Sequence, residues 1–400
     1  MPKKLLTSII ILTGILVEVT WVAGIVSGPV FMRLLNLSNT QLGIALGSLN
    51  IGLLIFSPVA GNISFRMGAA RVFFYGLLGM TAGISLIVIG SDFPILMSGM
   101  ILTGVANAFI INANMTILSE LFPSMIRRII SLYSALYFGG CALVAPLIGQ
   151  WLKFSSERGW HFFSFRMPFF LLMLIFMCLS VLAHRLIVPL VAAMHLKPSE
   201  EKSKISPGGR GQGVSKWFWV PLLAFFHGLM YIVMVSWLSP MARQKFGANE
   251  FEGSLFVGAA TLGMCLGRLS IAGLRLPWED RKVLSAGTIV GGGMLFAGLL
   301  VNSYVFSLAL IGLGSFIAST SFPCISSLGG DMFKEMRPRV FGYMYASYAV
   351  AGIVGTPLAG MLADSGVSLS WVLTISAFSA LMMGIISIIW KYGERKDSPA

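Results

Sequence analysis

Glu18 is a carboxylate in the middle of a long apolar segment, ILTGILVEVTWVAG at residues 11–24. An ionised carboxylate at the centre of a bilayer costs at least ~3 kcal/mol unless it is paired or hydrated. Such a group favours its protonated form when sealed from water and its ionised form when wet. It can therefore couple proton movement to a change in exposure, or bind a cationic solute. The alternative is a glutamate hydrogen-bonded to a neighbouring helix for packing.

His227 is a second titratable residue inside an apolar segment, WFWVPLLAFFHGLMYIVMVSWL, and Tyr231 follows it one turn later. Histidine titrates near neutral pH, so a pair formed by Glu18 and His227 is able to share or relay a proton. A lone histidine in a membrane span is also often a satisfied helix-packing group, and this alternative stays open.

Motifs for other chemistries are missing from the sequence. HExxH, GxSxG and paired carboxylates at catalytic spacing do not occur in the apolar segments, so we do not expect an intramembrane enzyme. The phosphate loop of an ATP-driven pump is also missing. No CxxC pair occurs, and we expect neither a disulfide, a metal site nor a cofactor. The cysteines, all within apolar segments, are Cys141, Cys178, Cys265 and Cys324.

The elements that position these residues are apolar runs of about twenty residues along the whole chain, each long enough to cross ~30 Å of hydrocarbon as a helix. The 400-residue chain is 56% hydrophobic and only 11% charged, with a mean hydropathy of +0.86, too apolar for a soluble protein. We expect an all-α polytopic membrane protein with twelve transmembrane helices. The predicted spans are 5–32, 41–64, 70–90, 94–118, 129–153, 166–190, 216–243, 251–275, 282–302, 304–330, 339–363 and 369–391.

The net charge of +13 indicates membrane topology rather than nucleic-acid binding. We assign all 28 Lys and Arg to loops and tails, and most of them to the two termini and the loops after even-numbered spans. Basic loops stay on the cytoplasmic side of a membrane, so both termini are predicted to be cytoplasmic. The short loops are typical of a multi-pass protein of the plasma membrane, here a bacterial inner membrane.

The second half of the sequence repeats the first at a constant offset. Tyr137 and Tyr348 are 211 positions apart, as are Pro146 and Pro357. At the same offset, His227 falls half a turn from Glu18, which predicts a similar depth. We expect two pseudo-symmetric six-helix bundles at 1–190 and 216–400, joined by a cytoplasmic linker at 191–215.

This organisation resembles the major facilitator superfamily. After the second span, GNISFRMGAAR is similar to the family's G-x-L-A-D-R-x-G-R-R/K, although Phe65 stands in place of the aspartate. The loops ELFPSMIRR and DMFKEMRPR are similar to the family's acid-to-arginine pattern. GGCALVAPLIG and AGIVGTPLAG partly resemble a Gly-Pro helix motif of exporters, and we expect Pro146 and Pro357 to be structural helix breaks.

The resemblance implies two bundles that rock around a site near the bilayer midplane, with the first, fourth, seventh and tenth spans lining a cavity. Polar residues at that depth are candidates to bind substrate, although each also suits helix packing. They are Trp21, Asn107, Asn112, Asn114, Tyr137, Tyr231, Ser315, Ser319, Thr320 and Tyr348. The repeated loop charges, Glu120 with Arg128 and Asp331 with Arg339, predict a cytoplasmic gate.

These features predict a secondary carrier of a small organic solute, coupled to protons through Glu18, with uptake slightly favoured. An exporter of drugs or amphipathic compounds is the main alternative, because 29 Phe and 23 Met supply an adaptable lining. A transporter-shaped scaffold or sensor without flux is the second. The expected partners are the solute, protons and the lipid bilayer, and the expected state is a monomer.

Overall fold

The computed structural model describes residues 2–122, 126–193, 215–273, 279–332 and 337–389. Every regular element in these ranges is a helix, and they contain twelve segments that are long and apolar enough to cross a membrane. The prediction of an all-α polytopic membrane protein is thus confirmed. The predicted spans agree with the observed ones within a few residues, the largest difference being the end of the first, at Val26 instead of 32.

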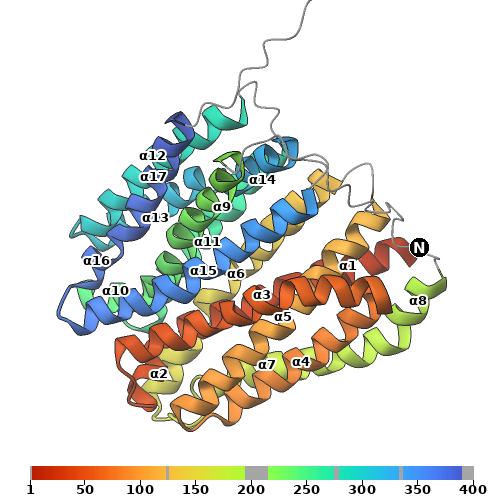
Figure 1. The fold of residues 1–400 in the computed structure, drawn as a ribbon. Coiled ribbons are helices and arrows are strands. Elements are labelled where there is room, and N and C mark those ends of the chain that lie inside the picture. Colours follow the sequence, from red (N-terminus) through yellow and green to blue (C-terminus); the bar gives the residue numbers. More distant parts are fainter. Residues whose placement is uncertain (1, 123–125, 194–214, 274–278, 333–336, 390–400) are drawn as a thin grey trace, which may run out of the picture.

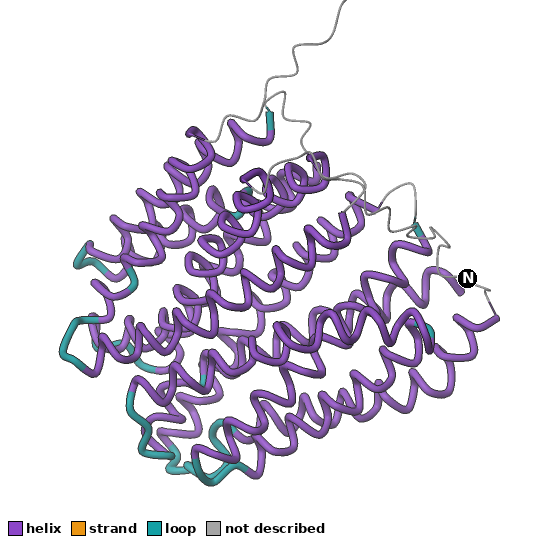
Figure 2. The backbone as a smooth tube through the Cα atoms, in the orientation of Figure 1, coloured by secondary structure: helices purple, strands orange, loops and turns teal. Residues whose placement is uncertain are grey.

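The long helices run roughly along one common direction, and the described loops gather mainly at one end of the molecule (Figure 2). The first half contains α1 (Pro2–Val26), α2 (Gly28–Leu34), α3 (Asn39–Met67), α4 (Ala69–Ile89), α5 (Phe93–Leu121), α6 (Ile126–Glu157), α7 (Arg166–Leu182), the π-helix η1 (Ala183–Ile187) and α8 (Val188–Ala193). The second half contains α9 (Ser215–Gly228), the π-helix η2 (Leu229–Val233), α10 (Met234–Phe246), α11 (Glu250–Gly273), α12 (Asp280–Leu300), α13 (Tyr304–Ala318), α14 (Ser321–Met332), α15 (Arg337–Asp364), α16 (Leu369–Val372) and α17 (Thr374–Ile389).

The two halves lie on two sides of the molecule and meet along two helix pairs (Figure 1). Helix α3 packs against α15, and α6 packs against α11. Helices α2, α10 and α16 lie at the end of the molecule that the basic residues predict to be external, which we call the outer face.

Equivalent residues of the repeat make equivalent contacts where the halves meet. A methyl group added at Gly47 of α3 would lie 3.4 Å from Pro357 of α15, and one added at Gly258 of α11 would lie 3.2 Å from Pro146 of α6. Each glycine is 211 positions from the other, as is each proline. The duplication seen in the sequence therefore recurs as two matching helix contacts.

Pro146 and Pro357 lie inside uninterrupted helices, so the prediction that they are helix breaks is wrong. A proline in a membrane helix is tolerated when neighbouring groups satisfy the backbone that it disturbs. Beside Pro357, the Thr356 hydroxyl lies 2.7 Å from the Gly352 carbonyl oxygen and 3.0 Å from that of Gly43 on α3. The tenth span is interrupted instead, between α13 and α14, shortly before Pro323.

Helices α3 and α5 approach each other through glycine at both sides of their contact. A methyl group at Gly104 would collide with the Leu49 carbonyl group, and one at Gly52 would collide with the backbone at Val105. Gly104→Ala is therefore expected to lower the free energy of unfolding by about 1–3 kcal/mol, measured from thermal unfolding in detergent. Gly293→Ala is the control, since nothing lies within 4 Å of an added methyl group there. Equal stability of the two variants would contradict this packing.

Candidate functional site

A cavity lies between the two halves, beside Glu18. Helices α1, α3, α4 and α5 line it from the first half, and η2 and α15 from the second. Its lining consists of Val17, Glu18, Thr20, Trp21, Leu49, Asn50, Leu53, Met80, Thr103, Asn107, Tyr231, Ile232 and Tyr348. Its volume is about 60 Å³, whereas sites for drug-sized ligands occupy ~300 Å³ or more. A solute of that size requires the halves to separate further.

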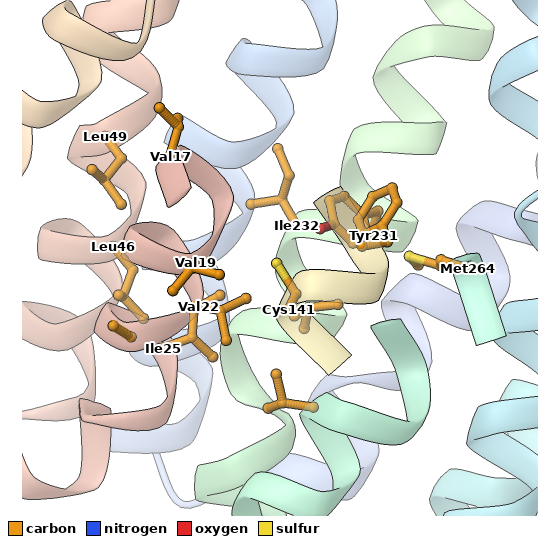
Figure 3. Packing of buried hydrophobic residues seen from close by; sticks show 14 of the residues in the cluster. Val17, Val19, Val22, Ile25, Leu46, Leu49, Cys141, Tyr231, Ile232 and Met264 are labelled. Atoms are coloured by element: carbon orange, nitrogen blue, oxygen red, sulfur yellow. The ribbon is translucent and has the colours of Figure 1, made fainter. Parts of the chain in front are cut away.

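Glu18 faces this cavity from helix α1. Its carboxyl group makes no hydrogen bond or ion pair with the residues that the structure describes, and its side chain is only partly buried. The neighbours Val17, Val19 and Val22 are buried among the hydrophobic side chains of the same region (Figure 3). Glu18 is thus an acid that faces the cavity from apolar surroundings.

A short π-helix, η2, carries the cavity wall of the second half. Tyr231 and Ile232 of η2 both line the cavity, and the ring of Tyr231 lies 5.4 Å from that of Trp21 on α1. Such π-helical turns are rare and occur frequently at functional sites. The Tyr231 hydroxyl is buried without a hydrogen-bond partner among the described residues. Trp21, Tyr231 and Tyr348, all predicted substrate contacts, therefore meet at one site.

His227 lies behind this wall rather than in it. Its Nδ1 is 2.9 Å from the Ser321 hydroxyl, and its ring lies 5.9 Å from that of Tyr348. It does not line the cavity, and no hydrogen bond joins it to Glu18. A direct pair between the two is not formed in this structure, and the proton-coupling role of His227 stays a prediction.

The three predicted asparagines of α5 have different surroundings. Asn107 lines the cavity, and its Oδ1 has no partner among the described groups. Asn112 donates to the Ala108 carbonyl of its own helix at 2.7 Å. Asn114 is fully buried and donates to the Tyr133 hydroxyl on α6 at 3.1 Å, so it joins helices. Asn50 of α3, which the sequence did not single out, also lines the cavity.

The predicted hydroxyl residues of the tenth span lie away from the cavity. Ser319 donates to the Phe316 carbonyl and Thr320 to the Ile317 carbonyl, as hydroxyl groups in membrane helices commonly do. Ser315 is buried where Gly263 of α11 packs on α13. This structure does not bring these three residues to the site.

Arg268 of α11 is a candidate that sequence reasoning missed, and its assignment to a loop is wrong. Its side chain is 3% exposed and lies within a membrane span. Nη1 donates to the Tyr137 hydroxyl on α6 at 2.9 Å, and the guanidinium lies 4.4 Å from the centre of the Phe138 ring. An arginine within the apolar stretch TLGMCLGRLSIAGL is a signal that could have found it.

The predicted cytoplasmic gate falls largely outside the described residues. Glu120 is partly buried at the end of α5. The side chains of Arg128, Asp331 and Arg339 are outside the part of the chain whose side chains the structure describes. The gate stays a prediction.

Polar contacts join the halves at the outer face. The Asp364 carboxylate, at the end of α15, accepts hydrogen bonds from the backbone and side chains of Asn39 and Thr40 at the start of α3. Glu250 of α11 forms an ion pair with Arg33 of α2 at 3.1 Å. These contacts, which we call the outer clasp, close the outer face in this structure.

Comparison with known proteins identifies the family. The profile of the Major Facilitator Superfamily matches residues 9–279 and 224–400, which together cover nearly the whole chain. The protein belongs to the Major Facilitator Superfamily. It is a multi-pass membrane protein with the fold of a transporter family.

Solved structures of this superfamily have the same fold. The E. coli fucose:proton symporter FucP has a TM-score of 0.66 at 15% identity, covering 97% of this chain and 99% of that one. A bacterial homolog of the human lysosomal transporter Spinster, inward-facing and occupied, has a TM-score of 0.68 at 12% identity, covering 96% and 94%.

The curated relatives align over shorter segments. The minor myo-inositol transporter IolF of Bacillus subtilis is 32% identical over 108 residues, 26% of this chain and 25% of that protein. The quinolone resistance protein NorA of Staphylococcus aureus is 23% identical over 136 residues, 34% and 35% of the two chains. The matched segments therefore span between a quarter and about a third of the length of these relatives.

Proposed function

We propose that this superfamily member is a proton-coupled carrier that moves a small organic solute by alternating access, with Glu18 as the proton-binding group. The observation that carries the proposal is the position of Glu18, which faces a cavity that both halves line and has no ion-pair partner among the described residues. A carboxyl group there exchanges its proton with whichever side of the membrane has access to the cavity. Separation of the halves at one face and closure at the other then moves solute and proton together.

Uptake is the direction that we favour. The fucose:proton symporter has this fold, and IolF is a transporter of myo-inositol by its name. Asn50, Asn107 and Thr103 supply amide and hydroxyl groups to the cavity, which suits a solute with polar groups.

Export of drugs or amphipathic compounds is a second candidate, favoured by two observations. Trp21, Leu53 and Met80 form an apolar part of the cavity wall, and one matching segment belongs to a quinolone resistance protein. Such a carrier would exchange solute for protons, so an inward proton gradient would empty vesicles of solute instead of filling them. The direction of gradient-driven flux separates the two, and flux of neither kind would indicate a scaffold or sensor.

We further propose that the protein works as a monomer in the plasma membrane, in a bacterial inner membrane, with both termini in the cytoplasm. The two halves of a single chain already enclose the cavity. Labelling of single cysteines in loops of intact cells tests this topology. Access from outside to position 302 and not to the N-terminus is the expected result.

The function is tested by screening purified protein against metabolites and drugs by thermal shift, followed by transport in proteoliposomes. An imposed proton gradient is expected to drive accumulation of a stabilising solute. Asn107→Ala should weaken solute binding about tenfold with little effect on turnover, since it removes a polar group of the cavity. Asn112→Ala is the control on the same helix, because its amide bonds to its own backbone. Equal affinities of the two variants would contradict the placement of the solute beside Asn107.

A further inference from the structure

Arg268 is a buried cation without an acidic partner within hydrogen-bonding distance among the residues that the structure describes. Its guanidinium donates one hydrogen bond to the neutral Tyr137 hydroxyl, and its Nε–H has no partner. The rings of Phe138 and Phe322 lie 4.4 and 5.4 Å from the guanidinium carbon. Burying a charge in such surroundings costs several kcal/mol. A purely structural role, in which Arg268 holds α11 against α6, would explain the hydrogen bond to Tyr137. Such a role does not require a permanently charged side chain.

One layer of aromatic side chains separates Arg268 from the cavity. Tyr231, in the cavity wall, lies 5.2 Å from Phe138 between ring centres, and Phe138 is a ring on which the guanidinium packs. Tyr348, also in the wall, lies 6.4 Å from Phe322. Rotation of these rings as the halves separate would expose Arg268 to a bound solute.

The unpartnered polar atoms around this layer suit an anion. The Arg268 Nε–H and the Tyr231 hydroxyl are both donors, both buried and both without a partner among the described residues. An unsatisfied buried group costs ~1–3 kcal/mol, which a ligand that accepts hydrogen bonds would recover. Hydrogen bonds from a guanidinium to a carboxylate are among the strongest in proteins.

Among the side chains that the structure describes, the charges at the site balance only when Glu18 is ionised. The titratable groups around Glu18 and Arg268 are Tyr133, Tyr137, Cys141, His227, Tyr231, Cys265, Tyr345 and Tyr348. All of these side chains are uncharged in their usual forms near pH 7, with histidine nearest to titration. Ionised Glu18 and Arg268 sum to zero. Protonation of Glu18 leaves one uncompensated positive charge in the interior.

We propose that the solute is an organic monocarboxylate, bound through its anionic group by Arg268 when Glu18 is protonated. This proposal rests on the proposed proton-coupled function and names its substrate class. The carboxylate restores neutrality, so proton binding and solute binding favour each other equally. One proton and one monoanion then cross together, with no net charge moved.

The test uses the full-length protein in detergent and thermal-shift measurements with lactate, benzoate, phenylacetate and nicotinate, each beside its carboxamide. At least one carboxylate is expected to raise Tm while its amide does not, with affinity about tenfold higher at about pH 5.5 than at about pH 8. Arg268→Gln should lose the shift, and Arg185→Gln, at an exposed position, should keep it. Glu18→Gln should bind the carboxylate equally at both pH values.

Two further variants separate binding from a structural role of Arg268. Tyr137→Phe removes the hydrogen bond between α6 and α11 but leaves the charge of Arg268, so it should weaken carboxylate binding less than Arg268→Gln does. Arg268→Lys keeps the charge and should bind the carboxylate more weakly than the wild type, because it loses the guanidinium's paired donors.

Three results of the thermal-shift experiment would overturn the monocarboxylate proposal. They are an equal shift by acid and amide, an undiminished shift in Arg268→Gln, and a panel in which no carboxylate raises the Tm of the wild type. Proton-driven, Glu18-dependent accumulation of a neutral solute such as fucose or myo-inositol would also overturn it while supporting the proposed function. The experiments therefore distinguish failure of the monocarboxylate proposal from failure of the proposed proton-coupled function.

Discussion

Glu18→Gln is expected to abolish gradient-driven accumulation of solute in proteoliposomes while leaving solute exchange across the membrane intact. A gradient of about two pH units drives a one-proton carrier to about hundredfold accumulation, because each unit is worth ~1.4 kcal/mol. Glutamine has the shape of the protonated side chain but cannot release a proton. The variant should therefore carry solute in both directions and only equalise its concentration.

The measurement is uptake of labelled solute with and without the gradient, with exchange measured at equal pH. Glu157→Gln is the matched control, since Glu157 is an exposed acid at the end of α6 whose ion pair, among the described residues, is with Lys153 one turn away. It should accumulate solute as the wild type does. Full accumulation by Glu18→Gln would show that another group couples protons to transport.

Asp364→Ala is expected to shift the conformational equilibrium towards a state open at the outer face. The Asp364 carboxylate accepts hydrogen bonds from both Asn39 and Thr40, and these bonds exist only while the halves are closed there. The site is exposed to solvent, so we expect a shift of about 1–2 kcal/mol, less than buried charged hydrogen bonds give. The population of the open state should then rise about five- to thirtyfold.

Asp92→Ala separates this effect from the loss of a helix cap. The Asp92 carboxylate accepts a hydrogen bond from the Ile95 backbone N–H at the start of α5. This bond lies within one half, so its loss lowers stability without removing a contact between the halves. Spin labels at Ser91→Cys and Asn302→Cys, both exposed in loops of the outer face, report the distance between the halves. The distance between the two labels is expected to increase in Asp364→Ala and to stay unchanged in Asp92→Ala. The same distances in both variants would contradict a role of the outer clasp in closure.

Much of the fold could be predicted from the sequence because lipid imposes one simple constraint. Every span must be apolar and about twenty residues long, and the duplication then pairs the halves without knowledge of their contacts. The depth of Glu18 follows from the same reasoning, as does that of Trp21 and Asn107, and all three line the cavity.

The parts that could not be predicted depend on contacts between helices. The sequence did not show that Arg268 lies within a span and not in a basic loop. Its burial depends on contacts with the rings of Phe138 on α6 and Phe322 on α14. Asn114 has the same residue type as Asn107 and lies on the same helix, but its amide nitrogen donates to Tyr133 of the neighbouring α6 instead of lining the cavity. The π-helical turn η2 changes the direction in which Tyr231 and its neighbours point, and α-helical residue spacing in the sequence does not reveal this change.

The effect of the two prolines also depends on contacts between helices that the sequence does not show. Pro146 and Pro357 suggested helix breaks because a proline removes a backbone donor. Each packs instead beside a glycine of the facing helix, and both helices continue. Two close helix pairs, α3 with α15 and α6 with α11, result from this arrangement.

The most direct test of proton coupling through Glu18 needs no solute. The distance between spin labels at positions 91 and 302 is measured at about pH 5.5 and about pH 8.5 in the wild type and in Glu18→Gln. If Glu18 is the coupling group, the distance distribution of the wild type shifts between the two pH values and that of Glu18→Gln does not. A shift of equal size in both proteins would contradict the proposal.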